Sequence, residues 1–199
     1  MQIHFKNHDL VAAEELRSKN LLKNRALAQS IQDVGWRSFF SKLEYKVKLY
    51  GKIYTKAIQL NSNEPVYYND RGSVLYMMKD YTHAIEEYTK AIKLNPDEAL
   101  IYYNRGLVYK EVDESDKAIA DFSKTIELDP NSALAYCERG IVYLLNFKDG
   151  SKAIIDINKS IALDPRYGKA YLARALYYYE LGDMENSNAD FTKAKMLGY

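Results

Sequence analysis

The sequence predicts an all-α protein: a right-handed solenoid of four helix–turn–helix units, preceded by a helical N-terminal extension. One observation is a string that recurs, since Ala91-Ile-Lys-Leu-Asn-Pro96 returns as Thr125-Ile-Glu-Leu-Asp-Pro130 and as Ser160-Ile-Ala-Leu-Asp-Pro165, at spacings of 34 and 35 residues. Another is that apolar residues recur at helical spacing inside each copy. Units that cannot bury their apolar faces alone must stack, so this periodicity predicts a solenoid.

The repeat spacing and the charge pattern divide the chain in the same way. Four units are expected over 65–98, 99–132, 133–167 and 168–199, with a half-repeat helix over 51–62 and a basic helical extension over 1–50. Residues 1–60 contain 11 Lys and Arg against 5 Asp and Glu, whereas residues 61–199 contain 17 against 22. The net charge of the whole chain is only +1. A change of charge sign along a chain indicates two segments with different partners or histories.

Each unit has the local signals of two helices. In the first unit, Asn63-Glu64-Pro65 places a capping residue and a proline at a helix start. Ala84, Tyr88 and Ala91 then share one face of a second helix. Asn95-Pro96 ends that helix, because proline disfavours helical backbone in the residue before it.

This pattern resembles the tetratricopeptide repeat, a helix–turn–helix of 34 residues with small, aromatic and proline residues at fixed offsets. The matching positions are Tyr68, Gly72, Ala84, Tyr88, Ala91 and Pro96; Tyr102, Gly106, Tyr109, Ala118, Phe122 and Pro130; Tyr136, Gly140, Tyr143, Ala153 and Pro165; and Tyr171, Tyr178, Phe191 and Ala194. The fourth unit departs from the pattern with Ala175, Ser187 and Tyr199. Small residues at the shared positions let the two helices of a pair approach closely, and we expect the aromatics to pack beside them.

Arginine and acid positions also repeat in phase. We expect four ion pairs inside the units, because the guanidinium fork meets a carboxylate on two donors. They are Arg71–Glu87, Arg105–Asp121, Arg139–Asp156 and Arg174–Asp190. The alternative is an arginine ladder that binds an anionic ligand, which would require the arginines to point away from these acids.

A stack of helix pairs leaves a concave surface lined by the first helices, and we expect this groove to bind a peptide or a helix. Its centre is expected to be apolar and its edges mixed. The candidate groove residues are Val66, Asn69, Ser73, Leu100, Tyr103, Asn104, Leu107, Leu134, Glu138, Ile141, Leu144, Leu145, Leu172 and Leu176.

Some members of the resembled family carry a basic clamp for the acidic tails of chaperones. Leu134 and Glu138 occupy positions that would be basic in such a clamp, and Asn104 alone matches it. The resemblance therefore implies protein binding but not a chaperone-tail clamp.

Residues 9–52 resemble an internal piece of the OrfB-type transposases of bacterial insertion sequences. The resemblance rests on the ordered set Glu14, Leu16, Lys23-Asn24, Asp33, Trp36 and Leu43-Glu-Tyr-Lys46. It implies kinship with a metal-dependent nuclease core, in which Glu14 would be one catalytic carboxylate. Two-metal hydrolysis needs several converging carboxylates, so one alone predicts no nuclease activity. The basic segments Lys19–Arg25 and Lys42–Lys56 leave weak phosphate binding open.

Composition narrows the remaining function classes. The only cysteine, Cys137, excludes an internal disulfide and fits a reducing, cytoplasmic location. No apolar run is long enough for a signal peptide or a membrane span. We expect no catalytic residues, metal or cofactor. The predicted function is non-catalytic binding of an unidentified protein or peptide, as a scaffold or adaptor; the alternatives are a transposase-derived, nucleic-acid-associated remnant and a self-associating structural protein.

Overall fold

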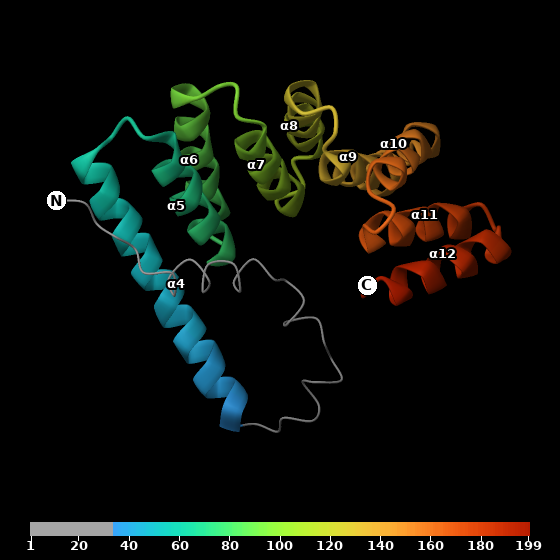
Figure 1. Cartoon of the computed structure of the whole chain (residues 1–199), viewed down its shortest axis with the longest axis horizontal. Helices are drawn as coiled ribbons and strands as arrows, with labels where there is room; N and C mark the ends of the chain where they lie inside the picture. The colour runs from blue at the N-terminus through green and yellow to red at the C-terminus, as the bar shows by residue number, and fades with distance from the viewer. Residues whose placement is uncertain (1–33) are drawn as a thin grey trace. The chain divides into compact units, whose positions relative to one another are not determined.

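The computed structural model describes residues 34–199, with side chains from Lys46 onward. The chain divides into two compact units, 1–46 and 47–199. The described residues form helices and no strand, so the predicted all-α repeat fold is confirmed (Figure 1). The helices are α4 (Val34–Leu60), α5 (Pro65–Met77), α6 (Tyr81–Leu94), α7 (Ala99–Glu111), α8 (Ser115–Leu128), α9 (Ala133–Leu145), α10 (Gly150–Leu163), α11 (Gly168–Glu180) and α12 (Met184–Met196).

Helices α5 to α12 form four hairpins, each within one expected unit, and each hairpin packs on the next. Close approach inside a hairpin depends on a glycine of the first helix. A Cβ built on Gly106 would lie only 2.8 Å from Cε1 of Phe122, whose side chain is fully buried. Gly72 faces Tyr88 and Gly140 faces Ile157 in the same way. In these three hairpins, a glycine of the first helix therefore packs against a large side chain of the second helix, as expected.

The turn inside each hairpin also repeats in phase. Lys79, Asp113, Lys148 and Gly182 have φ values of 61°, 59°, 53° and 76°. In three of these turns an aspartate follows and caps the second helix: Asp80, Asp149 and Asp183 each accept a hydrogen bond from the backbone N–H three residues later. Such caps satisfy orphan N–H groups and set where the second helix begins.

The first helices of successive hairpins also contact one another. Close approaches join α5 to α7, α7 to α9 and α9 to α11, while the second helices do not approach one another to the same extent. The first helices therefore lie closer to one another than the second helices do. The candidate groove residues predicted from the sequence belong to these first helices.

Helix α4 differs from the expectation for the N-terminal region. It runs without a break from Val34 to Leu60, so the expected boundary between the extension 1–50 and the half-repeat helix 51–62 falls inside one helix. Gly51 costs such a helix only about 1 kcal/mol, which a helix of 27 residues tolerates. Residues 1–33, including Glu14 and Lys19–Arg25, lie outside the described part, and the transposase resemblance stays a prediction.

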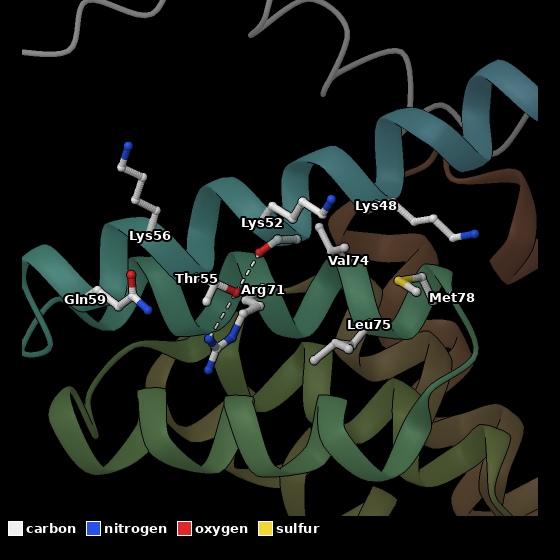
Figure 2. A pocket seen from close by; sticks show the side chains of 10 residues that line it. Lys48, Lys52, Thr55, Lys56, Gln59, Arg71, Val74, Leu75 and Met78 are labelled. Atoms are coloured by element: carbon white, nitrogen blue, oxygen red, sulfur yellow. Dashed lines mark hydrogen bonds between the residues drawn. The ribbon is translucent and has the colours of Figure 1, made fainter.

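The interface between α4 and α5 differs from the interface between α6 and α7 at one in-phase position. The α6–α7 interface contains Ile85, which packs on the cluster around Val108. The corresponding position of α4 is Gly51, which faces Val74. Because the isoleucine side chain is missing, a recess of about 570 Å³ remains between the two helices (Figure 2).

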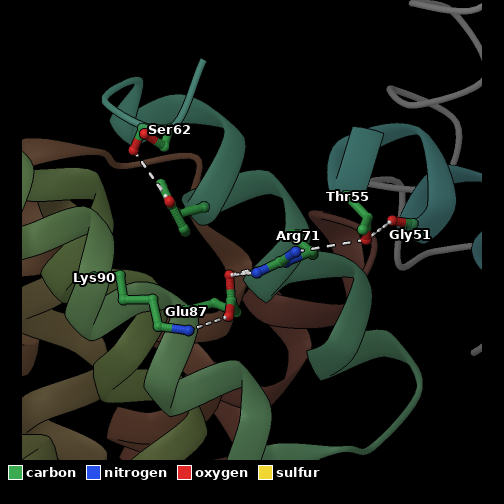
Figure 3. A network of polar contacts seen from close by, with 7 residues as sticks. Gly51, Thr55, Ser62, Arg71, Glu87 and Lys90 are labelled. Atoms are coloured by element: carbon green, nitrogen blue, oxygen red, sulfur yellow. Dashed lines mark hydrogen bonds and ion pairs between the residues drawn. The ribbon is translucent and has the colours of Figure 1, made fainter. Parts of the chain in front are cut away.

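The four predicted arginine–acid pairs are confirmed. Arg105 and Arg139 each meet an aspartate through Nε and Nη2 at 2.7–2.9 Å, and Arg174 does so at 2.6 and 2.9 Å. Arg71 donates to Oε2 of Glu87 through Nε and Nη2, and Lys90 donates to Oε1 of the same carboxylate at 2.9 Å (Figure 3). The acids are almost completely buried, whereas the arginines keep about a fifth of their side chains exposed.

Each arginine also reaches back to the second helix of the preceding unit. The acceptors, at distances of 3.5, 3.0, 2.9 and 2.9 Å, are Thr55, Thr89, Ser123 and Asn158. These four acceptors occupy equivalent positions in successive repeats. Helix α4 is therefore the equivalent of the second helices α6, α8 and α10. The arginines thus connect neighbouring units as well as the two helices of a hairpin.

Candidate functional site: the first-helix surface

One row of candidate residues is exposed along the N-terminal ends of the first helices. Val66, Leu100 and Leu134 hold the same position in three units and are 54%, 48% and 44% exposed. Leu145, the last residue of α9, and Leu176, in the C-terminal half of α11, are also exposed. We call these five residues the first-helix surface. Exposed leucine and valine side chains that recur at one position in three of the four units form a regular apolar feature of the kind that marks interaction sites.

Other candidates are partly covered by neighbouring helices. They are Ser73, Tyr103, Asn104, Leu107, Ile141 and Leu172. Leu107 packs on the cluster around Phe122, and the Tyr103 ring lies 5.9 Å from that ring. Burial raises the pKa of the Tyr103 hydroxyl, with the Glu138 carboxylate adding to the effect. These side chains pack beneath the exposed residues and offer a ligand less accessible area than the exposed residues do.

Three candidates do not line an open groove. Leu144 is 1% exposed and belongs to a core cluster with Ile157 and Ala170, because α11 packs closely on that side of α9. Asn69 is buried and accepts a hydrogen bond from Asn104 at 3.0 Å. Glu138 is 2% exposed. Assigning Leu144 to the groove was therefore wrong.

The expectation of an apolar centre was also wrong, because Glu138 is held between two lysines from neighbouring first helices. Lys110 of α7 donates to one carboxylate oxygen at 2.5 Å, and Lys169 of α11 donates to the other. Burial alone would raise the pKa of the Glu138 carboxyl, but Lys169 and Lys110 together hold that pKa below its usual value. Two cations around one carboxylate leave a net positive charge beside the apolar row.

Sequence reasoning missed this cluster for a physical reason. Lys110 lies 28 residues before Glu138, and Lys169 lies 31 residues after it. Neither spacing equals the repeat period, so in-phase comparison does not pair them. One signal in the sequence could have predicted the cluster. Glu138 is an acid on a first helix, and the first helices of the units before and after it contain Lys110 and Lys169.

The alternative of an arginine ladder for an anionic ligand is not favoured. All four arginines point to their own acids. Cys137 is fully buried, and burial raises the pKa of its thiol to about 12, which suits a packing role. Within residues 46–199, no group of three or more His, Cys, Asp or Glu side chains is placed to hold a metal ion. No helix of the described region is both long and apolar enough to cross a membrane.

Repeated hairpins joined by small-to-large packing, with an exposed row on the first helices, define an α-helical repeat scaffold. Models of the tetratricopeptide repeat match residues 99–132 and 168–197, and a further TPR repeat model matches residues 72–113. These matches support a TPR repeat protein and a scaffold for protein interaction. Repeats of this kind are generally non-catalytic interaction modules.

Solved structures share this fold. A crystal structure of MamA superposes with a TM-score of 0.69 at 24% identity, covering 84% of this chain and 95% of that chain. The Arabidopsis OM64 TPR domain has a TM-score of 0.57 at 26% identity, covering 58% and 95% of the two chains. YrrB, described as a TPR protein with an unusual peptide-binding site, has a TM-score of 0.62 at 19% identity, covering 87% and 90%. No curated protein sequence matches the chain.

Proposed function

We propose that the repeat array binds a peptide or helical segment of a partner protein on its first-helix surface, and that it acts as a non-catalytic scaffold or adaptor. The observation that carries the proposal is the in-phase row of Val66, Leu100 and Leu134, about half exposed on three successive units. A partner segment that spans the row meets one apolar contact per unit. This periodic arrangement favours an elongated ligand over a small molecule.

The energetics of the apolar contacts alone fit a weak affinity. Full burial of one leucine contributes about 1.5–3 kcal/mol before ordering costs. Two or three such contacts, less the cost of association of about 4 kcal/mol or more, give at best a dissociation constant in the millimolar range, so a tighter complex needs polar or ionic contacts as well. The Lys110–Glu138–Lys169 cluster lies beside the row and carries a net positive charge, so it favours a segment with a carboxylate near its apolar residues.

The test compares two double variants of the full chain in affinity capture from cells that express it. Leu100→Glu with Leu134→Glu places two charges on the proposed surface. Ile155→Glu with Met196→Glu adds the same charge on second helices, where these side chains are 68% and 77% exposed. We expect the first variant to lose the proteins that wild type captures and the second to keep them, with unchanged circular dichroism for both.

Recovery of the same proteins by the Leu100 and Leu134 variant would show that partners bind elsewhere. Light scattering of the same samples separates the alternative in which another copy of the chain occupies the surface. In that case wild type self-associates, and only the Leu100 and Leu134 variant is monomeric.

A further inference from the structure

We propose a second binding site, separate from the first-helix surface: the recess between α4 and α5 binds an acidic amphipathic helix of a partner protein. The recess lies on the α4-facing side of α5 and shares no residue with the candidate groove (Figure 2). Its lining residues are Lys48, Gly51, Lys52, Thr55, Lys56, Gln59, Arg71, Val74, Leu75 and Met78.

Two sequence changes at the in-phase interface explain why the recess exists. Gly51 stands where Ile85, Ile119 and Ile154 stand in the later second helices. Leu75 stands where the later first helices have Tyr109, Tyr143 and Tyr178. A Cβ built on Gly51 meets only Val74 Cγ1, at the ordinary contact distance of 3.6 Å. The space is therefore large enough for a side chain that this chain does not supply.

The rim of the recess is positively charged. Four of the ten lining residues are Lys or Arg and none is acidic. Arg71 is neutralised by Glu87, but within the described part of the chain no acid pairs with Lys52 or Lys56. Lys52 and Lys56 are exposed and lie one helical turn apart, about 6 Å along α4. The rim therefore favours a ligand with carboxylates at a matching spacing.

The floor of the recess is apolar. Val74, Leu75 and Met78 of α5 form it together with the bare backbone at Gly51, and Met78 is 46% exposed. A purely ionic ligand would cover this floor without gaining from it. A ligand with apolar side chains between its carboxylates gains both hydrophobic burial and charge complementarity.

A helix matches the length of the site. Lining residues of α4 extend from Lys48 to Gln59, about three turns or 16 Å. Carboxylates at positions i and i+4 of an incoming helix have the same 6 Å spacing as Lys52 and Lys56. Apolar side chains at i+3 and i+7 of that helix lie on the adjoining face and reach the floor.

The net charge of the repeat region favours a short acidic helix over a long nucleic acid as the occupant. Residues 61–199 contain 17 Lys and Arg against 22 Asp and Glu. A long polyanion that extended from the recess over the repeat units would meet this excess of acids and be repelled. A short acidic helix contacts only the lysine-rich rim.

The charge test measures fluorescence anisotropy of a labelled peptide of about 16 residues, with leucine on one helical face and glutamate on the flanking positions. We expect Lys52→Glu with Lys56→Glu to weaken binding by about tenfold or more. Lys159→Glu with Lys193→Glu is the matched control, since both lysines are exposed and lie on α10 and α12. This control gives the same net charge and is expected to bind like wild type, and wild-type binding is expected to weaken between about 50 and 300 mM salt.

The volume test uses two substitutions at Gly51. Gly51→Ile restores the side chain that later units have, so it fills the recess, and we expect it to weaken peptide binding. Gly51→Ala gives a similar gain in helix propensity without the volume, and we expect it to keep most of the binding. Circular dichroism of both variants reports whether α4 stays folded.

Several outcomes overturn the proposal. Equal binding by the Lys52 and Lys56 variant and its control shows that the rim lysines do not hold the peptide. A second peptide, in which glutamine replaces each glutamate, removes the charge argument if it binds as strongly as the first.

Other occupants give distinct results. If a single-stranded oligonucleotide binds more tightly than the peptide, and the Lys52 and Lys56 variant loses this binding, the recess is assigned to nucleic acid. Self-association of wild type that this variant abolishes assigns it to another copy of the chain. Leu100→Glu with Leu134→Glu keeps peptide binding if the two sites are separate, so a failure of either proposal is distinguishable.

Discussion

At the scale of single residues, the arginines show which contacts a repeat makes predictable. The acids that pair with Arg105 and Arg139 recur as carboxylates at one position, so in-phase comparison predicted each partner. The contact with the preceding unit was not predicted, because its acceptor changes from threonine to serine to asparagine. These residues share an accepting oxygen at one register position but not an identity. A pattern of identities therefore finds the ion pair and misses the hydrogen bond.

Glu138 yields a prediction about pH. The pKa of its carboxyl is lowered in the folded chain, because the attraction of Lys169 and Lys110 outweighs the effect of burial. A group with a lowered folded pKa stabilises the fold above its unfolded pKa, and this stabilisation is lost as pH falls through the folded pKa. We expect Glu138→Gln to be less stable than wild type at pH 7, and the difference to shrink as pH falls below the ordinary value of about 4.5.

Urea denaturation of both proteins between about pH 7 and pH 3 checks this expectation. The control is Glu127→Gln, which removes an exposed carboxylate that pairs with Lys124. A stability difference between wild type and Glu138→Gln that stays constant over the whole range would contradict the assigned role of Glu138.

At the scale of helices, two glycines with different surroundings explain where the helices approach closely and where they do not. Gly106 lies in the middle of α7 and has no room for a Cβ beside Phe122. Gly51 lies in α4 and has room for a larger side chain. The first allows a tight hairpin, and the second leaves an interface between units incompletely filled.

The same substitution is expected to have opposite effects at these two positions. Gly106→Ala should lower the free energy of unfolding by about 1–3 kcal/mol, because the new methyl group displaces a fully buried ring. Gly51→Ala should raise it by about 0.5–1 kcal/mol, because alanine loses less backbone entropy in a helix and meets no obstruction. Thermal and urea denaturation of the two variants measures both effects. Destabilisation by both substitutions to the same extent would contradict the difference in packing.

Helix ends were more predictable than helix continuity. The predicted ends at Pro65 and at Asn95-Pro96 lie where the structure has the start of α5 and the end of α6. The unbroken course of α4 was missed, because the expected half-repeat helix was bounded by the repeat arithmetic and not by a stop signal. Gly51 alone does not end a helix, and nothing else around residue 50 does.

At the scale of the molecule, periodicity predicted the order of the hairpins and the side on which the first helices lie, because stacking follows directly from unburied apolar faces. The site was predicted only in part. Val66, Leu100 and Leu134 are exposed as a binding row requires, whereas Leu144 is core and Glu138 is a buried, paired acid. The difference arises because burial on the first helices depends on how closely α7, α9 and α11 approach one another. That spacing is a property of the assembled stack and not of any one unit.

The most direct measurement of the central claim is site-specific photo-crosslinking in cells. A photoreactive phenylalanine analogue replaces Leu134 on the first-helix surface in one full-length chain and Ile155 on the second helix α10 in another; these side chains are 44% and 68% exposed. We expect discrete protein adducts from position 134 and none from position 155, even though position 155 is the more accessible. Adducts from position 155 alone, or the same adducts from both, would contradict a protein-binding surface on the first helices.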